Sequence, residues 1–274
     1  MKKVTLNNGV EMPALGLGTF RSKDENAYNA VLHAIKSGYR LIDTAAIYGN
    51  EEEVGRAIRD SGVKREDLFI TTKLWWADHG YLSAKKALKK SLKRLGLDYV
   101  DLYLIHWPKD YSDNKDSYQA MEDLYFEGYT RAIGVSNFSF HHLEHLLEDA
   151  EIVPQVNQVE THLYLQNYKL QEFCMKRGIY LEAYAPLMSN EIKTLLQDET
   201  VSKIAKKHGK TNPQIALRFL NQREIVAIPK SENAQRIEEN FAIFDFELDD
   251  EDMKELFSLN KAKKTFPDPD NFLI

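Results

Sequence analysis

Residues 102–106 read Leu102-Tyr103-Leu104-Ile105-His106, a short apolar run that ends in a side chain able to take part in chemistry. Seven further runs of this kind occur along the 274 residues, and stretches of helical character separate them. The runs that we expect to form strands span residues 14–18, 40–43, 68–73, 100–106, 132–136, 155–159, 180–183 and 225–228. Strands that alternate with helices in this way predict an α/β fold, the (β/α)8 TIM barrel, with one parallel sheet.

The stretches between these runs carry helix signals. Ser22 and Glu25 fit a capping box at the start of a helix that Gly38 ends. Pro213, two residues after Thr211, fits the first turn of another helix. The remaining expected helices span residues 51–60, 82–95, 117–126, 140–147, 168–177, 200–208, 232–240 and 250–258, the last being an extra C-terminal helix.

An Asn8-Gly9 pair near the N-terminus is a strong signal for the turn of a β-hairpin. Because this segment precedes the first barrel strand, we expect an N-terminal β-hairpin that covers the bottom of the barrel. No Pro/Gly-rich linker or shift in composition divides the rest of the sequence. A barrel of this kind needs about 250 residues, so residues 1–274 are interpreted as one domain.

Composition argues against several classes of partner. The net charge is −6, so the chain lacks the basic excess with which proteins attract nucleic acid. No apolar run approaches the ~18 residues of a membrane span, and the residues after Met1 show no signal-peptide pattern. Cys174 is the one cysteine, and we interpret it as an ordinary helix residue. These features favour a cytoplasmic protein without nucleic-acid or membrane partners.

Four chemically active side chains lie at or just after the ends of three consecutive predicted strands. Asp43, Lys73 and His106 each end a strand, and Tyr48 follows Asp43 by five residues. The carboxyl ends of barrel strands meet at one rim, where such barrels have their active sites. Burying a lone charge is very unfavourable, so Asp43 and Lys73 are expected to pair. A purely structural ion pair is the alternative, but the four residues together favour a catalytic site.

Three long motifs, in this order along the chain, resemble the signatures of the aldo-keto reductase family. They are Gly38-Tyr39-Arg40-Leu41-Ile42-Asp43-Thr44-Ala45 with Tyr48, Glu51 and Val54-Gly55; Arg131-Ala132-Ile133-Gly134-Val135-Ser136-Asn137-Phe138; and Ile228-Pro229-Lys230-Ser231 with Arg236 and Glu239-Asn240. The resemblance extends from the opening hairpin to residues 267–270, and it is to the shorter, bacterial-type members.

The resemblance implies an enzyme, an NADPH-dependent oxidoreductase that transfers hydride to the carbonyl of small aldehydes or ketones, with α-dicarbonyls and keto sugars possible. Tyr48 would be the general acid that protonates the carbonyl oxygen. Lys73, held by Asp43, would lower the pKa of this phenol. His106 would hydrogen-bond the carbonyl oxygen and orient it.

The resemblance also implies which residues bind the cofactor. Ser136, Asn137 and Gln158 would hydrogen-bond the nicotinamide carboxamide, and Tyr184 would stack on the ring. The other cofactor-binding residues implied are Gly18, Thr19, Phe20 and Asp43 at the mouth, Ala185, Pro186 and Leu187 around the pyrophosphate, and Glu239 and Asn240 near the adenine. Met188-Ser189-Asn190 stands where related proteins more often have a glycine.

Lys230, Ser231 and Arg236 form a polar cluster between the last predicted strand and the start of a helix. Barrels often bind phosphate at this place. Two cations there favour the extra phosphate of NADPH over NADH, and bidentate arginine chemistry suits that phosphate. A solvated basic helix start is the alternative.

Aromatic side chains follow several of the strand ends, as expected for a small-molecule site. The expected substrate-pocket residues are Phe20, Trp75, His106 and Trp107, and the resemblance places the two tryptophans beside the carbonyl. Trp76 is unusual, since an asparagine is frequent at this position of the family. Packing alone is the alternative for these aromatic residues. Residues 272–274 are expected over the entrance.

Two other patterns point to weaker sites. Gly16 and Gly18 begin what looks like a dinucleotide fingerprint, but Arg21 stands where its third glycine would be, so we reject a Rossmann site. The three histidines at positions 141, 142 and 145 lie on one predicted helix. A solvated helix face is the preferred interpretation, so no metal is expected.

Two other functions fit parts of the sequence. A class I aldolase is also a barrel with a lysine at a strand end, but Lys73 beside Asp43 would stay protonated and be a poor nucleophile. A cofactor-sensing binding subunit would tolerate loss of the acid, yet all four catalytic positions are filled. We therefore interpret the chain as an enzyme, and we expect it to be monomeric, with a small carbonyl compound as its partner.

Overall fold

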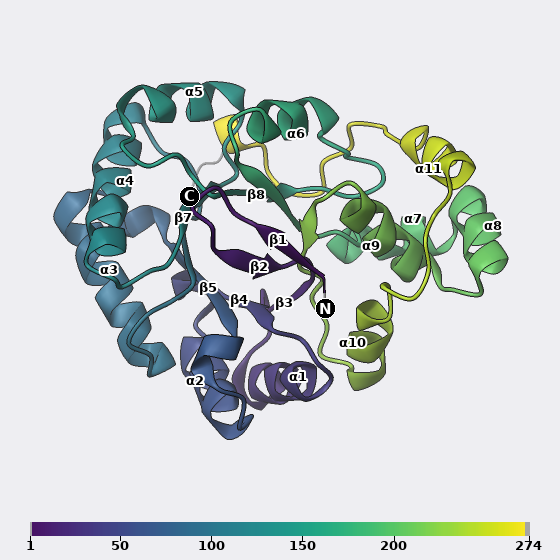
Figure 1. Cartoon of the computed structure of the whole chain (residues 1–274), viewed down its shortest axis with the longest axis horizontal. Coiled ribbons are helices and arrows are strands. Elements are labelled where there is room, and N and C mark those ends of the chain that lie inside the picture. The colour runs from purple at the N-terminus through teal and green to yellow at the C-terminus, as the bar shows by residue number, and fades with distance from the viewer. Residues whose placement is uncertain (1, 272–274) are drawn as a thin grey trace.

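The computed structural model describes residues 2–271, and eight parallel strands form a closed barrel at its centre (Figure 1). The strands are β3 (Gly16–Gly18), β4 (Leu41–Asp43), β5 (Phe69–Leu74), β6 (Leu102–Ile105), β7 (Ile133–Ser136), β8 (Val156–Glu160), β9 (Tyr180–Tyr184) and β10 (Val226–Ala227). Each strand pairs with the next in chain order, and bridges from Leu15 to Ala227 and from Gly18 to Lys230 close the ring. The expected (β/α)8 fold is confirmed, with strand ends within two residues of those expected.

Gly18 is required where the ring closes. Its amide donates a hydrogen bond to the carbonyl of Pro229 at 3.1 Å. A Cβ at this position would lie 2.8 Å from the carbonyl oxygen of Ile228, closer than real Cβ atoms come to backbone. Any larger residue would therefore separate β3 from β10. The glycines that superficially suggested a dinucleotide fingerprint belong to a strand that closes the barrel.

Helices surround the barrel on its outside (Figure 1). They are α1 (Asp24–Lys36), α2 (Glu51–Asp60), α3 (Tyr81–Leu95), α4 (Tyr111–Phe126), α5 (Phe140–Asp149), α6 (Tyr168–Met175), α7 (Ile192–Leu196), α8 (Glu199–His208), α9 (Asn212–Gln222), α10 (Ala234–Phe241) and α11 (Asp250–Phe257). The expected helix start at Thr211 is confirmed, because its side chain caps α9. Helix α4 begins six residues before the expected start at residue 117, since Asp110 accepts a capping hydrogen bond from the Asp113 amide. Helix α7 was not expected.

The capping box expected at Ser22 is wrong. The residue before α1 is Lys23, and no side chain caps this helix. Ser22 is buried, and its carbonyl oxygen accepts a hydrogen bond from the side chain of Asn50 at 2.9 Å. A tertiary contact, which local sequence does not encode, holds Ser22 outside the helix.

The N-terminal hairpin has the expected position and a longer turn than expected. Strands β1 (Lys3–Thr5) and β2 (Glu11–Pro13) pair antiparallel. Between them the Leu6 amide donates to Val10, and the Gly9 amide donates to Leu6, each at 2.9 Å. Asn8-Gly9 therefore lies inside a wider loop, in which Gly9 adopts a positive φ of 83°.

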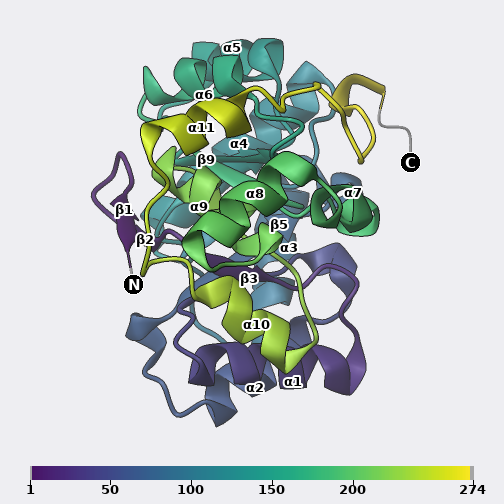
Figure 2. The same cartoon turned by 90° about the vertical axis from the view of Figure 1, so that its right-hand side faces the viewer.

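This hairpin closes one end of the barrel, as expected. Figure 2 shows β1 and β2 at one end and the segment that follows α11 at the other. Val4, Leu6 and Met12 of the hairpin segment pack in one buried cluster with residues that begin or precede the strands, namely Leu41, Phe69, Leu102, Ala132, Val156 and Val226. Because side chains alternate along each strand, the next inward positions lie closer to the opposite end. That end is where the polar side chains gather.

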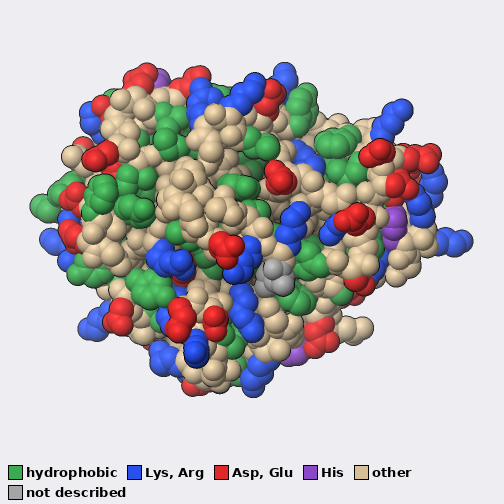
Figure 3. Space-filling view, viewed as in Figure 1, with side chains coloured by type: hydrophobic (Ala, Val, Ile, Leu, Met, Phe, Trp, Pro, Cys, Tyr) green, Lys and Arg blue, Asp and Glu red, His purple; other side chains and the backbone are tan. Residues whose placement is uncertain are grey.

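The surface of the barrel is charged and mixed. Acidic and basic side chains are interspersed over the face of the described chain shown in Figure 3, so this face has no broad region of one sign. Within residues 2–271, no helix combines the length and the apolar character needed to cross a membrane.

Truncation of Met12 should destabilise the protein strongly. Its side chain is fully buried under the barrel, so Met12→Ala is expected to lower the free energy of unfolding by about 2–5 kcal/mol. Urea unfolding followed by circular dichroism measures this change. Glu11→Ala in the same strand is the control. Its ion pair with Lys3 is exposed, so a change within about 0.5 kcal/mol is expected. Equal losses in the two variants would contradict this account of the hairpin.

Candidate active site

The carboxyl end of the barrel holds a buried ion pair. Lys73 in β5 is fully buried, and its Nζ donates to Asp43 Oδ1 at 2.5 Å and to the carbonyl oxygen of Thr44 at 2.9 Å. Asp43 is the last residue of β4, which neighbours β5 in the sheet. Pairing of the two charges offsets the large cost of burying either one alone.

Tyr48 and His106 lie beside this ion pair. Tyr48 belongs to a short 3-10 turn, Ala46–Tyr48, that follows β4, and Lys73 Nζ lies 5.1 Å from the centroid of its ring. The ring of His106, which directly follows β6, lies 5.5 Å from the Tyr48 ring. The structure thus brings together the four side chains that the sequence singled out.

The surroundings raise the pKa of Tyr48 well above its ordinary value of 10. Burial is the largest cause, and the negative charges of Asp43 and, once it is ionised, Glu182 add to it. The net change is opposite to the lowering expected from Lys73, and the contribution of Lys73 itself stays a prediction. The ammonium of Lys73 is paired with Asp43 at 2.5 Å, and the negative charge of Asp43 acts on the phenol in the direction opposite to that of the ammonium. At neutral pH Tyr48 therefore holds its proton firmly.

His106 is a neutral imidazole in these surroundings. Burial lowers its pKa well below 6.5, and the positive charge of Lys73 lowers it further. Its Nδ1 is buried without a hydrogen-bond partner among the residues described. A neutral imidazole donates one hydrogen bond and accepts another, so His106 can bind a polar oxygen without adding a charge.

The loops that carry these groups are tied together by Asn50, which the sequence reasoning missed. Its side-chain amide donates to the carbonyls of Thr19 and Ser22 and accepts from the Thr44 hydroxyl. Thr19 in turn donates to the carbonyl of Asp43 from its amide at 3.0 Å and from its hydroxyl at 2.9 Å. A buried asparagine just before an amphipathic helix looks like a helix cap, so no local signal distinguished it.

The three residues expected at the carboxamide also lie at this end. The Asn137 side chain donates to the His106 carbonyl at 2.9 Å and accepts from the Tyr184 hydroxyl at 2.8 Å. The Ser136 hydroxyl donates to the carbonyl of Gln158 at 2.8 Å. Asn137 adopts a positive φ of 64°, a conformation that asparagine tolerates better than most residues. These contacts connect β7, β8 and β9 at the mouth.

Glu182, in the middle of β9, is a further buried acid that the sequence reasoning missed. It is fully buried, and its Oε2 accepts from the Gln158 side-chain nitrogen at 2.7 Å. Burial raises the pKa of Glu182 to about 8, and the negative charge of Asp43 contributes. A carboxylate in the middle of an apolar strand was the available signal.

Aromatic rings surround the mouth. The Trp75 ring lies 5.3 Å from His106, and the Phe20 ring lies 5.2 Å from Tyr48. Trp107 is buried. Trp76 packs against Lys109, whose Nζ lies 4.7 Å from the centroid of the Trp76 ring.

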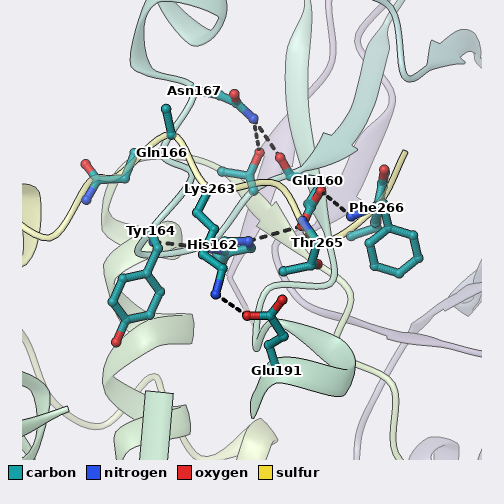
Figure 4. Close-up of polar contacts among 12 residues, drawn as sticks. Glu160, His162, Tyr164, Gln166, Asn167, Glu191, Lys263, Thr265 and Phe266 are labelled. Atoms are coloured by element: carbon teal, nitrogen blue, oxygen red, sulfur yellow. Dashed lines mark hydrogen bonds and ion pairs between the residues drawn. The ribbon is translucent and has the colours of Figure 1, made fainter. Parts of the chain in front are cut away.

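A C-terminal segment, residues 263–271, covers part of the mouth. Glu160 of β8 anchors this segment (Figure 4). The carboxylate of Glu160 accepts from the amides of Thr265 at 2.8 Å and Phe266 at 3.1 Å, and from the Thr265 hydroxyl. Although burial raises the pKa of Glu160, contacts with His162 and Thr265 outweigh it and leave that pKa below its ordinary value. Residues 272–274, which were expected over the entrance, lie outside the described residues.

Phe266 is the aromatic residue that this segment adds to the mouth. Its ring lies 5.2 Å from that of Tyr184 and 6.3 Å from that of Phe20. Lys263 forms an ion pair with Glu191, just beyond the loop that follows β9 (Figure 4). Contacts more than a hundred residues apart place Phe266, so sequence spacing gave no signal for it.

The expected phosphate cluster lies at the start of α10. Lys230 Nζ pairs with Glu232 at 2.7 Å, and the Asn233 side chain caps the helix by accepting from the Arg236 amide at 3.0 Å. Arg236 is exposed on the first turn of α10, and Ser231, three residues before this helix, is buried.

Two further expected residues lie along α10. The Glu239 carboxylate accepts from the Thr211 hydroxyl at 2.7 Å, and Asn240 is buried. The structure thus places Glu239 and Asn240 on the same helix as the exposed arginine of the phosphate cluster.

The loop after β9 has the backbone that glycine usually provides. Ala185, Met188 and Ser189 have positive φ values of 46°, 66° and 47°, a region unfavourable for residues with a Cβ. The side chain of Met188 is buried. Met188-Ser189-Asn190 therefore differs from the family pattern in sequence but keeps positive φ values of the kind that glycine favours. Met188 also adds a buried side chain.

The histidines of α5 do not simply face solvent. His141 and His142 come together with Asp270, and the three ligand atoms lie within 4.8 Å of one another. Both Nδ1 atoms contact the Ser139 hydroxyl. His145 packs against the Tyr111 ring at 5.7 Å. The expectation that the protein binds no metal stays a prediction.

A model of the aldo/keto reductase family matches residues 14–261. With the barrel and the site described above, the chain belongs to this family of oxidoreductases, whose members use nicotinamide cofactors. Glyoxal reductase from Bacillus subtilis (strain 168) is 54% identical over 273 residues, which cover 99% of this chain and 97% of the relative. Morphine 6-dehydrogenase from Pseudomonas putida is 45% identical over 277 residues, covering 97% and 94%. The crystal structure of an aldo-keto reductase from a Medee basin deep-sea metagenome library has a TM-score of 0.98 and 60% identity, covering 99% and 100%.

Docking of residues 263–271 should weaken in acid. The pKa of Glu160 in the docked state lies below its ordinary 4.5. The ionised carboxylate therefore stabilises docking above that ordinary value, and the stabilisation is lost as the pH falls through the lower docked-state pKa. Hydrogen–deuterium exchange of residues 263–271, followed from neutral to acidic pH and corrected for the intrinsic exchange rate, should show this loss.

Two variants check the origin of the effect. Glu160→Gln should speed exchange of residues 263–271 already at neutral pH. Glu172→Gln removes an exposed ion pair with Lys176 on α6 and should leave this exchange unchanged. If the two variants exchange alike, Glu160 does not anchor the segment.

Proposed function

We propose that this protein reduces the carbonyl group of small aldehydes or ketones with hydride from NADPH. The observation that carries the proposal is the gathering of a phenol, a neutral imidazole and a balanced ion pair at one barrel mouth. Reduction of a carbonyl places negative charge on its oxygen, which a proton donor and a hydrogen-bond donor stabilise. Membership of an oxidoreductase family supports the same reaction class.

Tyr48 is the proposed general acid. Its raised pKa keeps the phenol protonated over the physiological pH range, as an acid catalyst requires. His106, neutral and 5.5 Å away between ring centroids, would hydrogen-bond the carbonyl oxygen and fix its position relative to the phenol. Lys73 and Asp43 would hold the electrostatic field constant beneath them.

The groups at the mouth fit a nicotinamide dinucleotide. Both protons of the Gln158 amide are committed to the buried carboxyl groups of Asp43 and Glu182, so its side-chain oxygen is the atom left for a carboxamide N–H. The Tyr184 ring offers a flat surface for stacking. Lys230 and Arg236 supply two cations at the start of α10 for a phosphate. When bound, the dinucleotide supplies the hydride.

The aromatic mouth supports a small substrate. Phe20, Trp75 and Phe266 contribute rings around the catalytic groups, and such walls bury a compact ligand well. One relative that spans nearly the whole chain is a glyoxal reductase. We therefore extend the proposal to small aldehydes and α-dicarbonyls as the first compounds to assay.

The contacts of Lys73 argue against the aldolase alternative. A Schiff base needs a neutral amine with a free lone pair. Lys73 Nζ instead donates to Asp43 and to the Thr44 carbonyl, as an ammonium does.

Replacement of Tyr48 by Phe should abolish reduction but not binding. Removal of a general acid costs about 10²–10⁴-fold in turnover, whereas the dinucleotide contacts proposed above lie on other residues. NADPH consumption with a panel of small carbonyl compounds measures turnover, and quenching of protein fluorescence measures NADPH binding. Tyr168→Phe, at an exposed position of α6, is the matched control. Near-normal turnover of Tyr48→Phe would remove Tyr48 from the proposed role.

Replacement of Arg236 by Ala should weaken NADPH more than NADH. A lost hydrogen bond to a charged group is worth about 1.5–3 kcal/mol, so the Kd for NADPH should rise roughly tenfold or more. The Kd for NADH should change little. Lys254→Ala, which removes an exposed cation from α11, controls for overall charge. Equal weakening of both dinucleotides by Arg236→Ala would place the extra phosphate elsewhere.

A further inference from the structure

Glu182 occupies the barrel interior below the candidate active site. It lies in the middle of β9, where it is opposite Gln158 of β8 and Val226 of β10. Because side chains alternate along a strand, Glu182 faces inward together with Tyr180 and Tyr184. It is fully buried, and neither the proposed chemistry nor the proposed cofactor contacts use it.

A chain of hydrogen bonds connects Glu182 with the ion pair. The side-chain nitrogen of Gln158 donates to Asp43 Oδ2 at 2.8 Å and to Glu182 Oε2 at 2.7 Å. The other oxygen of Asp43 accepts from Lys73. Strands β4 and β8 lie four places apart in the eight-stranded sheet. The Gln158 side chain therefore reaches across the barrel to Asp43 and also contacts Glu182 of the adjacent strand β9.

The charges of this chain do not balance if both acids are ionised. The chain Lys73–Asp43–Gln158–Glu182 contains two carboxyl groups and one ammonium, and an unpaired buried charge is very unfavourable. Asp43 has the ammonium at 2.5 Å. Glu182 has only a neutral amide, and its Oε1 has no hydrogen-bond partner within residues 2–271. The neutral form is therefore favoured at Glu182.

We propose that Glu182 is held as a neutral carboxylic acid beneath the mouth, where it acts as a positioning residue that fixes the Gln158 amide and keeps the field at Tyr48 constant. This inference rests on the proposed function, since it concerns the proton donor of the same site. Ionisation of Glu182 would place a second negative charge near Tyr48 and make the phenol a weaker acid. Carbonyl reduction should then decline as the pH rises through the titration of Glu182.

The charged groups that act on Glu182 are Asp43 from β4 and Lys73 from β5. The phenols that share the interior with it are Tyr48 from the turn after β4 and, on β9 itself, Tyr180 and Tyr184. On its other neighbour, β10, the adjacent inward side chains Val226 and Ile228 are aliphatic. The alkaline change is therefore assigned to the coupled Asp43 and Glu182 pair, with the proton on the glutamate.

Infrared spectroscopy tests the protonation state without any need for activity. Spectra of the full-length protein should contain the carbonyl stretch of a buried carboxylic acid at neutral pH. This band should shift in D2O and disappear as the pH rises. The difference spectrum between wild type and Glu182→Gln should contain it, whereas that for Glu160→Gln should not, because Glu160 is a buried acid of the adjacent strand whose pKa is lowered. A wild-type spectrum without this band would overturn the proposal.

The pH profile of turnover tests the positioning role. The alkaline limb of kcat with NADPH and a small aldehyde should lie at least about one pH unit higher in Glu182→Gln than in wild type. In Glu172→Gln, which changes an exposed acid of α6, the limb should stay where it is in wild type. A purely structural role would lower kcat at every pH without moving the limb, and that result would overturn the positioning role.

The two tests separate this inference from the proposed function. A wild-type protein that reduces no carbonyl compound would refute the proposed function and, with it, the positioning role at Tyr48. The infrared band would still decide whether Glu182 is neutral.

Discussion

A buried ammonium is the constraint on which the mouth of this barrel depends. An unpaired lysine ammonium is very unfavourable in an apolar interior. Lys73 therefore donates hydrogen bonds to the Asp43 carboxylate and to the Thr44 carbonyl. Asp43 is in turn fixed by two hydrogen bonds. The Thr19 hydroxyl donates to its backbone carbonyl, and the Gln158 side-chain amide donates to its second carboxylate oxygen. One charge therefore orders groups from β3, β4, β5 and β8. Tyr48 and His106 are positioned by the same elements.

The barrel interior divides into two ends with different physical roles. Where the hairpin covers it, the inward side chains are apolar and provide packing energy. At the carboxyl end they are polar, and several carry buried charge. Buried ion pairs contribute little net stability and are sensitive to the loss of one partner. The apolar end and the outer strand–helix core thus stabilise a fold whose other end is organised for chemistry.

Some site residues could be predicted from the order of the strands. Side chains that meet only across the barrel could not be predicted in this way. Asp43, Lys73 and His106 were found because they end strands, and the strand ends of a parallel barrel share one rim. Glu182 lies in mid-strand and meets Gln158 only inside the barrel. Phe266 is held at the mouth because the amides of Thr265 and Phe266 donate to Glu160, which precedes them in the sequence by 105 and 106 residues. Ser22 fitted a cap by pattern, but Asn50 holds it in a tertiary contact.

Strand β8 links the interior of the site with its cover. Val156, Gln158 and Glu160 alternate with outward residues and so face inward at three successive heights. The first packs with the hairpin cluster, the second joins the two buried acids, and the third anchors the segment that carries Phe266. A shift of β8 along its axis would move all three together. Because β9 pairs with all five residues of β8 and β7 pairs with its first three, the sheet holds the height of the Gln158 amide and of the C-terminal segment in a fixed relation.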